Sequence, residues 1–232
     1  AIREAISFAK KCSSKLYALS VVEVLTDYEA FSPQKIEDAL EAGVKNHLEL
    51  VKTRAQNESV DCETIIAYGE PHQGIVDEAK RRKVDIIVLG RRGTKGLKKL
   101  LIGEVAAKVI GHAPCNVLVV PKAAVIGYRN ILVATDGSGH SVAAAEQAIR
   151  IAKRCGSSVI ALSSIRSNDE MKEAKANVNK VIEMAQKEGI PAEGLMPMGR
   201  SYNVIVETAG GRGVDLIVIG IPVKTALKKI FT

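Results

Sequence analysis

The chain has 232 residues, of which 47% are hydrophobic and 25% charged, and its formal net charge is +7. These values are typical of a soluble globular protein with one large or two ordinary domains, and neither a membrane-spanning apolar run nor a signal-peptide pattern is present. Basic residues are scattered among acidic ones, and aromatic residues make up only 3%. We therefore do not expect nucleic-acid binding to be the main function.

Cysteine usage points to a reducing compartment. Cys12, Cys62, Cys115 and Cys155 form no C-x-x-C pair and accompany no histidine cluster, which disfavours a metal site or a disulfide framework. We expect reduced core thiols in a cytoplasmic protein.

Short runs rich in valine and isoleucine alternate with amphipathic helical patterns along the chain. The first half predicts, in order, helix 1–11, strand 15–24, helix 35–57, strand 62–68, helix 72–83, strand 84–89, helix 103–111 and strand 116–120. After a linker at 121–127, the second half predicts strand 131–135, helix 141–155, strand 157–163, helix 168–188, strand 192–198, helix 203–213 and strand 214–219. This alternation predicts an α/β protein whose parallel sheets are covered by helices on both faces.

An internal repeat divides the chain. The run Val-Asp-Ile-Ile-Val-Leu-Gly at 84–90 reappears as Val-Asp-Leu-Ile-Val-Ile-Gly at 214–220. We therefore predict two tandem domains, 1–122 and 128–232. In this register the first strand of repeat one would precede the chain's first residue, and the last helix and strand of repeat two would follow its last residue. We expect the sequence to be part of a longer chain.

The segment 90–104 has the composition of an anion-binding loop. It follows an apolar strand, precedes a helical pattern and holds several glycines. Glycines let backbone N–H groups approach a phosphate, and a helix start adds unpaired N–H groups and the positive end of a dipole. The segment is neither a P-loop nor a Rossmann fingerprint, and Gly90 and Gly93 could instead be simple turn glycines. Ligands of open parallel sheets bind beyond the carboxyl ends of the strands, where both this segment and Asp136 fall.

On these residues the chain resembles the universal stress proteins, in a tandem two-domain form. The family motif, G-x-x-G followed after nine residues by G-[S/T], is matched by Gly90, Gly93 and Gly103, with Glu104 in place of the hydroxyl residue. The run Ala-Thr-Asp-Gly-Ser at 134–138 resembles the end of the family's first strand. The resemblance covers essentially every predicted element. It implies two doubly wound domains, each with a five-stranded parallel sheet flanked by helices, as in the adenine nucleotide alpha hydrolase-like fold.

The resemblance also implies binding of AMP or ATP, with Mg²⁺ as a candidate companion. The glycines of the motif would donate backbone N–H groups to phosphates, and Asp136 would lie near adenine and ribose unless it only fixes its loop by an Asx turn. The residue after the second strand would meet adenine through its backbone. The candidate residues are Gly90, Arg91, Arg92, Gly93, Gly103, Glu104 and Val21 in repeat one, and Thr135, Asp136, Ser164 and Gly220 in repeat two.

Both repeats depart from the family pattern. Glu104 is a like charge for a phosphate, which Arg92 or Lys95 would have to offset, so we predict that AMP is preferred over ATP. The other interpretation is that Glu104 only complements the dipole of a helix start. In repeat two, Pro222 has no N–H and Val223 brings a branched side chain, which predicts a weaker phosphate site.

Three functions fit these patterns. The first is a nucleotide-binding regulatory or stress-response protein, the second a scaffold of the same family that binds no nucleotide, and the third a weak ATP hydrolase. The third is disfavoured because His72, His112 and His140 are isolated in the sequence and no general base is in place. The family's homodimer would be replaced by an internal pseudo-dimer joined through the two last strands, and a further homodimer is compatible with this arrangement.

Overall fold

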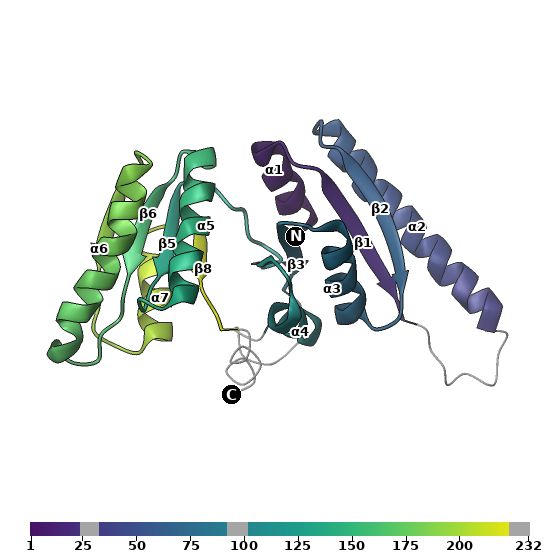
Figure 1. The fold of residues 1–232 in the computed structure, drawn as a ribbon. Helices are drawn as coiled ribbons and strands as arrows, with labels where there is room; N and C mark the ends of the chain where they lie inside the picture. The colour runs from purple at the N-terminus through teal and green to yellow at the C-terminus, as the bar shows by residue number, and fades with distance from the viewer. Residues whose placement is uncertain (24–32, 92–101, 223–232) are drawn as a thin grey trace. The chain divides into compact units, whose positions relative to one another are not determined.

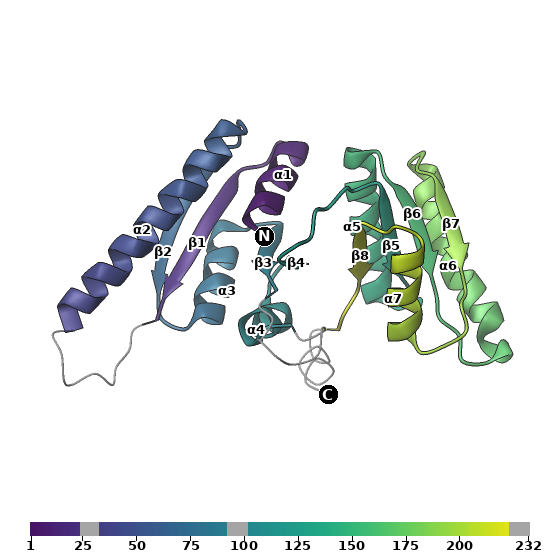
Figure 2. The same ribbon diagram turned by 180° about the vertical axis from the view of Figure 1, so that it is seen from behind.

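The computed structural model describes residues 1–23, 33–91 and 102–222, with the backbone alone for 33–40. These residues divide into two compact units, which we call unit 1 (residues 1–124) and unit 2 (residues 125–222). Their elements are labelled in Figure 1 and seen from behind in Figure 2. Among the described helices, none combines the length and apolar character needed to cross a membrane.

Unit 1 alternates helices and strands in the predicted order. Its elements are α1 (Ile2–Cys12), β1 (Leu16–Val22), α2 (Pro33–Asn57), β2 (Cys62–Tyr68), α3 (Pro71–Arg82), β3 (Ile86–Gly90), α4 (Glu104–His112) and β4 (Asn116–Val120). The strands form two parallel pairs, β1–β2 and β3–β4, and no described strand joins the pairs into one sheet.

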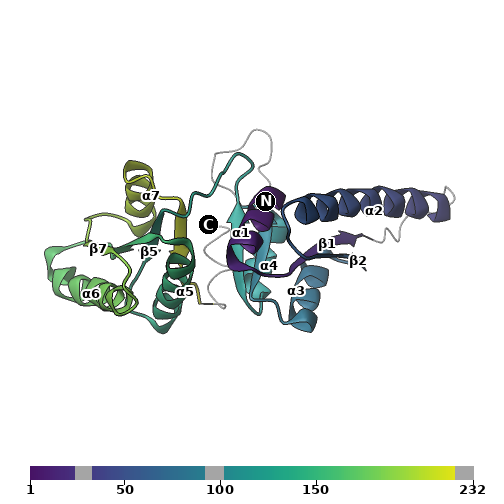
Figure 3. The same cartoon turned by 90° about the horizontal axis from the view of Figure 1, so that it is seen from above.

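The helices of unit 1 cover its strands on both faces. Figure 3 shows α2 along one face of the β1–β2 pair and α3 on the other. One apolar cluster joins Ile6 and Ala9 of α1 to Ala55 of α2 and Cys62 of β2. A second joins α3, β3 and α4 and includes Val109, which is fully buried.

Unit 2 carries a single four-stranded parallel sheet in the order β7-β6-β5-β8. Its elements are β5 (Asn130–Ala134), α5 (Gly139–Cys155), β6 (Ser158–Leu162), the short helix η1 (Asn168–Glu170), α6 (Met171–Lys187), β7 (Ala192–Leu195), α7 (Ser201–Gly211) and β8 (Leu216–Ile219). Helices α5 and α6 pack on one face of the sheet and α7 on the other, as Figures 1 and 2 show from opposite sides.

The strand β5 lies in the middle of this sheet, and its run Ile131, Leu132 and Val133 is completely buried. From β5 the chain continues to β6 and β7 on one side and then crosses to β8 on the other side of β5. The direction in which strands are added therefore reverses at β5. This reversal point is where doubly wound proteins form their ligand crevice.

The α/β architecture with helix-covered parallel sheets is confirmed, and most element bounds lie within two residues of the predictions. The predicted helix 168–188 is divided, because it opens with the three-residue turn η1 before α6 begins. The predicted strand 192–198 ends at Leu195, although an isolated bridge between Ile165 and Met198 continues the pairing beyond β6 and β7.

Candidate functional site

The predicted site residues lie at the carboxyl ends of strands in both units. In unit 1, Gly90 is the last residue of β3 and Gly103 immediately precedes α4. The predicted residues Arg92 and Gly93, and the predicted counter-charge Lys95, lie outside the described residues. Unit 1 therefore presents the two ends of the glycine segment: the end of β3 and the start of α4.

The backbone at the end of β3 is only partly used by the sheet. The N–H of Arg91 donates to the carbonyl of Val120 at 2.9 Å and extends the pairing of β3 with β4. Because successive N–H groups of a strand point to opposite edges, the N–H of Gly90 points away from β4. A Cβ atom at Gly90 would meet the Cβ of Ala1 at 3.6 Å, an ordinary contact. Among the described atoms, a Cβ at Gly90 would therefore make this one contact without overlap.

The start of α4 has the features of an anion-binding helix end. Gly103 is its N-cap residue in an extended conformation, and among the described residues no side-chain hydrogen bond caps the first turn. The carbonyl of Gly103 accepts from the N–H of Ala107 at 3.0 Å, so the helix begins regularly. The N–H groups of the first turn then remain for a ligand or solvent, at the positive end of the helix dipole.

Glu104 opens α4, and its charge is balanced within the helix. Its side chain is 73% exposed, and its Oε1 lies 3.0 Å from the Nζ of Lys108, one turn later. The same ammonium group lies 3.3 Å from Oε1 of Glu70, which precedes α3. The two carboxylates, that of Glu104 first, raise the pKa of Lys108 above its ordinary value. Lys108 thus places one positive charge beside both carboxylates. The predicted roles of Arg92 and Lys95 stay predictions.

His72 and His112 are not isolated in the fold, which corrects the expectation from the sequence. Nδ1 of His72 lies 3.0 Å from Oε1 of Glu70. The rings of His72 and His112 have their centroids 5.9 Å apart and are tilted by 51°. The packing of α3 against α4, which brings the two rings together, cannot be seen in the sequence. Throughout residues 1–23, 41–91 and 102–222, however, no three His, Cys, Asp or Glu residues are arranged to hold a metal ion.

Val21 lies near the end of β1, where a backbone contact with adenine was predicted. Its side chain packs against α3, because a Cβ atom built at Gly74 would come within 3.0 Å of Val21 Cγ2. This packing agrees with the kind of contact that the resemblance implied, and the contact itself stays a prediction.

In unit 2, the loop after β5 is held by its own hydrogen bonds. The N–H of Ser138 donates to Oδ1 of Asp136 at 3.0 Å, which is the Asx turn that the sequence left open as an alternative. The hydrogen bonds from Ser138 hold the pKa of Asp136 below its usual value. Thr135 is buried, and its Oγ1 lies 3.2 Å from Oγ of Ser141.

Gly220 follows β8 and is packed against α5. A Cβ atom at this position would overlap the carbonyl group of His140 in the first turn of α5. The glycine is therefore required for the approach of helix to strand, a role that differs from that of Gly90. Ser164 follows β6, and its Oγ lies 2.7 Å from Oγ of Ser201 at the start of α7.

Both units are of the α/β class, with parallel strands covered by helices and with the predicted site residues in loops at the carboxyl ends of the strands. Residues 1–121 and 127–232 each match the model of the universal stress protein family, and the chain belongs to this family.

Individual relatives support the same assignment. The chain is 36% identical over 130 residues to the universal stress protein MJ0531 of Methanocaldococcus jannaschii, covering 53% of this chain and 74% of that protein. It is 34% identical over 133 residues to the universal stress protein Sll1388 of Synechocystis, covering 51% of this chain and 86% of that protein. A universal stress protein from Archaeoglobus fulgidus has the same fold, with a TM-score of 0.78 at 20% identity over 93% of this chain and 79% of that one.

The sequence analysis did not identify Lys108, which forms ion pairs, or the packing role of Gly220. The interaction of Lys108 with Glu104 had a signal, the i,i+4 spacing of opposite charges on one helix. No sequence signal could have shown the contact of Lys108 with Glu70 or the packing of Gly220 against His140, because each joins segments far apart in the chain.

Proposed function

We propose that the protein binds an adenine nucleotide, AMP or ATP, at the carboxyl ends of the strands of unit 1, and that binding serves a regulatory role in stress without catalysis. The observation that carries this proposal is the start of α4, where no side chain of the described residues caps the first turn. Such a helix end favours a phosphate group through its N–H groups and its dipole. Membership of the universal stress protein family supports a stress role.

The charges around α4 favour a ligand with few phosphate groups. Glu104 and Glu70 bring two negative charges to this end of unit 1, and Lys108 brings one positive charge to both. The resulting excess of negative charge disfavours a triphosphate more than a monophosphate, because the triphosphate carries more negative charge. We therefore propose AMP as the preferred ligand. If ATP binds, Mg²⁺ would be held through the phosphate oxygens, as this ion commonly is.

Unit 2 is the weaker candidate for the same ligand. The backbone at Gly220 is engaged with α5, Asp136 is engaged in its own turn, and Pro222 has no N–H to offer. These features favour the scaffold hypothesis for unit 2. We therefore propose one nucleotide per chain.

Calorimetric titration of the full chain with AMP and with ATP tests the proposal. We expect saturable binding near one AMP per chain and a weaker response to ATP. Absence of heat with both nucleotides, together with absence of adenine nucleotide in the supernatant of denatured purified protein, would leave the scaffold hypothesis in place. Release of phosphate from ATP above the buffer rate, lost in Gly93→Val, would instead favour the hydrolase.

A further inference from the structure

The loops that follow β1 and β2 in unit 1 have structural counterparts after β6 and β7 in unit 2. The N–H of Gly69 donates to the carbonyl of Val22 at 2.9 Å. In the same way, the N–H of Gly199 donates to the carbonyl of Ile165 at 2.8 Å. These two hydrogen bonds set the equivalence of the loops by geometry, independently of the sequence register.

The residues that follow these hydrogen-bonded positions are negatively charged in unit 1 and positively charged in unit 2. Glu23 follows Val22 in unit 1, whereas Arg166 follows Ile165 in unit 2. Glu70 follows Gly69, whereas Arg200 follows Gly199. The same edge therefore carries two carboxylates in unit 1 and two guanidinium groups in unit 2.

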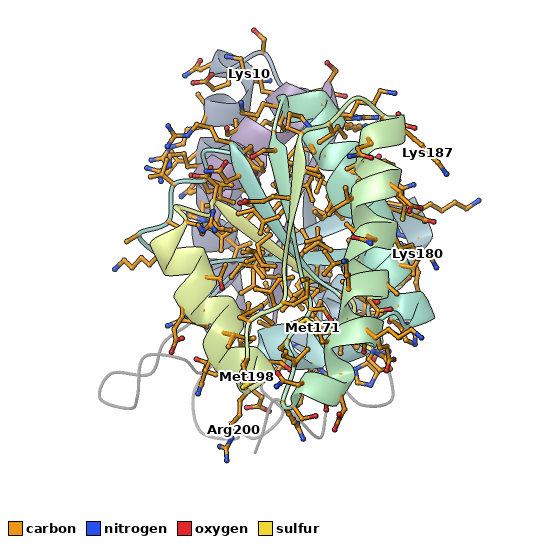
Figure 4. The ribbon with its side chains drawn as sticks, turned by 90° about the vertical axis from the view of Figure 1, so that its left-hand side faces the viewer. Lys10, Met171, Lys180, Lys187, Met198 and Arg200 are labelled. Carbon is orange, nitrogen blue, oxygen red and sulfur yellow. The ribbon has the colours of Figure 1, made fainter. Side chains whose placement is uncertain are left out.

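The two arginines of unit 2 lie on neighbouring loops and are exposed. The bridge between Ile165 and Met198 places Arg166 beside the residues that lead into α7. Figure 4 shows Arg200 and Met198 toward the end of unit 2 where α7 begins, whereas Lys180 and Lys187 lie farther along α6. Within the described ranges, neither guanidinium has a carboxylate partner.

Hydroxyl groups lie between the two loops. Oγ of Ser164, two residues before Arg166, is 2.7 Å from Oγ of Ser201, the residue after Arg200. The acidic residues nearest in sequence are Asp169 and Glu170, and Oε2 of Glu170 accepts from the backbone N–H of Arg166 at 2.8 Å. That carboxylate is thereby tied to the main chain, which leaves both guanidinium groups for another acceptor.

We propose that unit 2 binds an anionic group of the phosphomonoester class between Arg166 and Arg200, with the hydroxyls of Ser164 and Ser201 as further hydrogen-bond partners. Planar guanidinium groups match phosphate oxygens two at a time, and charge-assisted hydrogen bonds are about twice as strong as neutral ones. A phosphate at this edge needs no donor from the segment after Gly220, where Pro222 offers none. The site is separate from the start of α4 and does not depend on nucleotide binding there.

Titration of the full chain with inorganic phosphate, followed by backbone amide resonances, tests this site. We expect the amides of Arg166, Gly199 and Arg200 to shift in a saturable way, and the affinity to fall about tenfold or more in Arg166→Glu/Arg200→Glu. The matched control is Lys180→Glu/Lys187→Glu, which changes the net charge equally on the exposed side of α6 and should keep the affinity. Both pairs are exposed, so both variants should fold.

The outcomes separate this proposal from nucleotide binding in unit 1. If 5′-AMP shifts the same unit 2 amides as inorganic phosphate, the site accepts the phosphate of a small organic ligand. If only inorganic phosphate does so, the site takes the free anion. Either result supports the site, whatever happens at Gly90 and α4. An equal loss of affinity in the two charge-reversed variants, or no saturable shift of unit 2 amides with either probe, would overturn it.

Discussion

The two units build equivalent strands into different surroundings. In unit 2, β6 pairs with β5 on one side and with β7 on the other, and four of its five residues are buried. In unit 1, β2 is the one described strand that pairs with β1, and each of the seven residues of β1 is only partly buried. Both strands are similarly apolar. The comparison shows that burial of such a strand comes from its two neighbours and its covering helices, and that composition does not decide it.

The glycines at the ends of β3 and β8 differ in the same way. Each ends the same apolar run. A Cβ at Gly220 would overlap the carbonyl of His140, whereas among the described atoms a Cβ at Gly90 would make only an ordinary contact with Ala1. Gly220 is required for packing, whereas the structure would tolerate a small side chain at Gly90. The predictions below use such matched pairs, from the largest expected effect to the smallest.

The largest effect is expected from equivalent leucines in the two units. Leu162→Ala removes a side chain that is 1% exposed, so we expect it to lower the free energy of unfolding of unit 2 by about 2–5 kcal/mol. Leu19→Ala, at the equivalent place in β1, should cost about 1 kcal/mol in unit 1, because Leu19 is only half-buried. Denaturant titration followed by amide resonances of each unit separately gives both values. Equal losses would show that the partial burial of β1 does not describe the protein in solution.

The next effect concerns the two strand-end glycines. Gly220→Ala should destabilise unit 2 by about 1–3 kcal/mol, because the new Cβ overlaps backbone that must move. Gly90→Ala should change the stability of unit 1 by less than about 0.5 kcal/mol. The same unfolding experiment measures both variants. A larger loss for Gly90→Ala would mean that the space beside Gly90 is filled.

A moderate effect on ligand preference is expected at the start of α4. Glu104→Ser removes a negative charge and restores the residue type of the family motif. It should raise the affinity for ATP more than that for AMP, by about fivefold, since one charge contact near water is worth about 1 kcal/mol. Lys108→Met should act oppositely, because it leaves Glu104 and Glu70 without their shared cation. Calorimetry with both nucleotides checks the pair, and parallel changes in both variants would contradict the charge argument.

The smallest effect is a pH dependence in unit 2. Because hydrogen bonds from Ser138 lower the pKa of Asp136 in the folded protein, its contribution to stability is present above the unfolded value of about 4 and is lost as the pH falls through the folded value. Asp136→Asn should therefore be less stable than the parent at pH 7, by about 0.5 kcal/mol after discounting for exposure, and equally stable in strong acid. Unfolding curves across this range measure the difference. A difference that grows on acidification would have the wrong sign.

Much of the fold could be predicted from the sequence, because the features that define it are local. Valine-rich runs such as the one ending at Gly90 alternate with helical patterns, and the internal repeat marks the second copy. The candidate site was predictable only in outline. The ion pair of Lys108 with Glu70, the pairing of His72 with His112 and the packing of Gly220 arise from segments that only the folded chain brings together.

The central claim is that backbone groups at the end of β3 and the start of α4 hold the phosphate of an adenine nucleotide. The most direct test compares the AMP affinity of Gly90→Val with that of Arg91→Ala by calorimetry on the full chain. The account predicts that Gly90→Val loses more affinity, because its side chain blocks the approach of phosphate to the backbone. A greater loss in Arg91→Ala would contradict it, since side-chain charge would then hold the ligand.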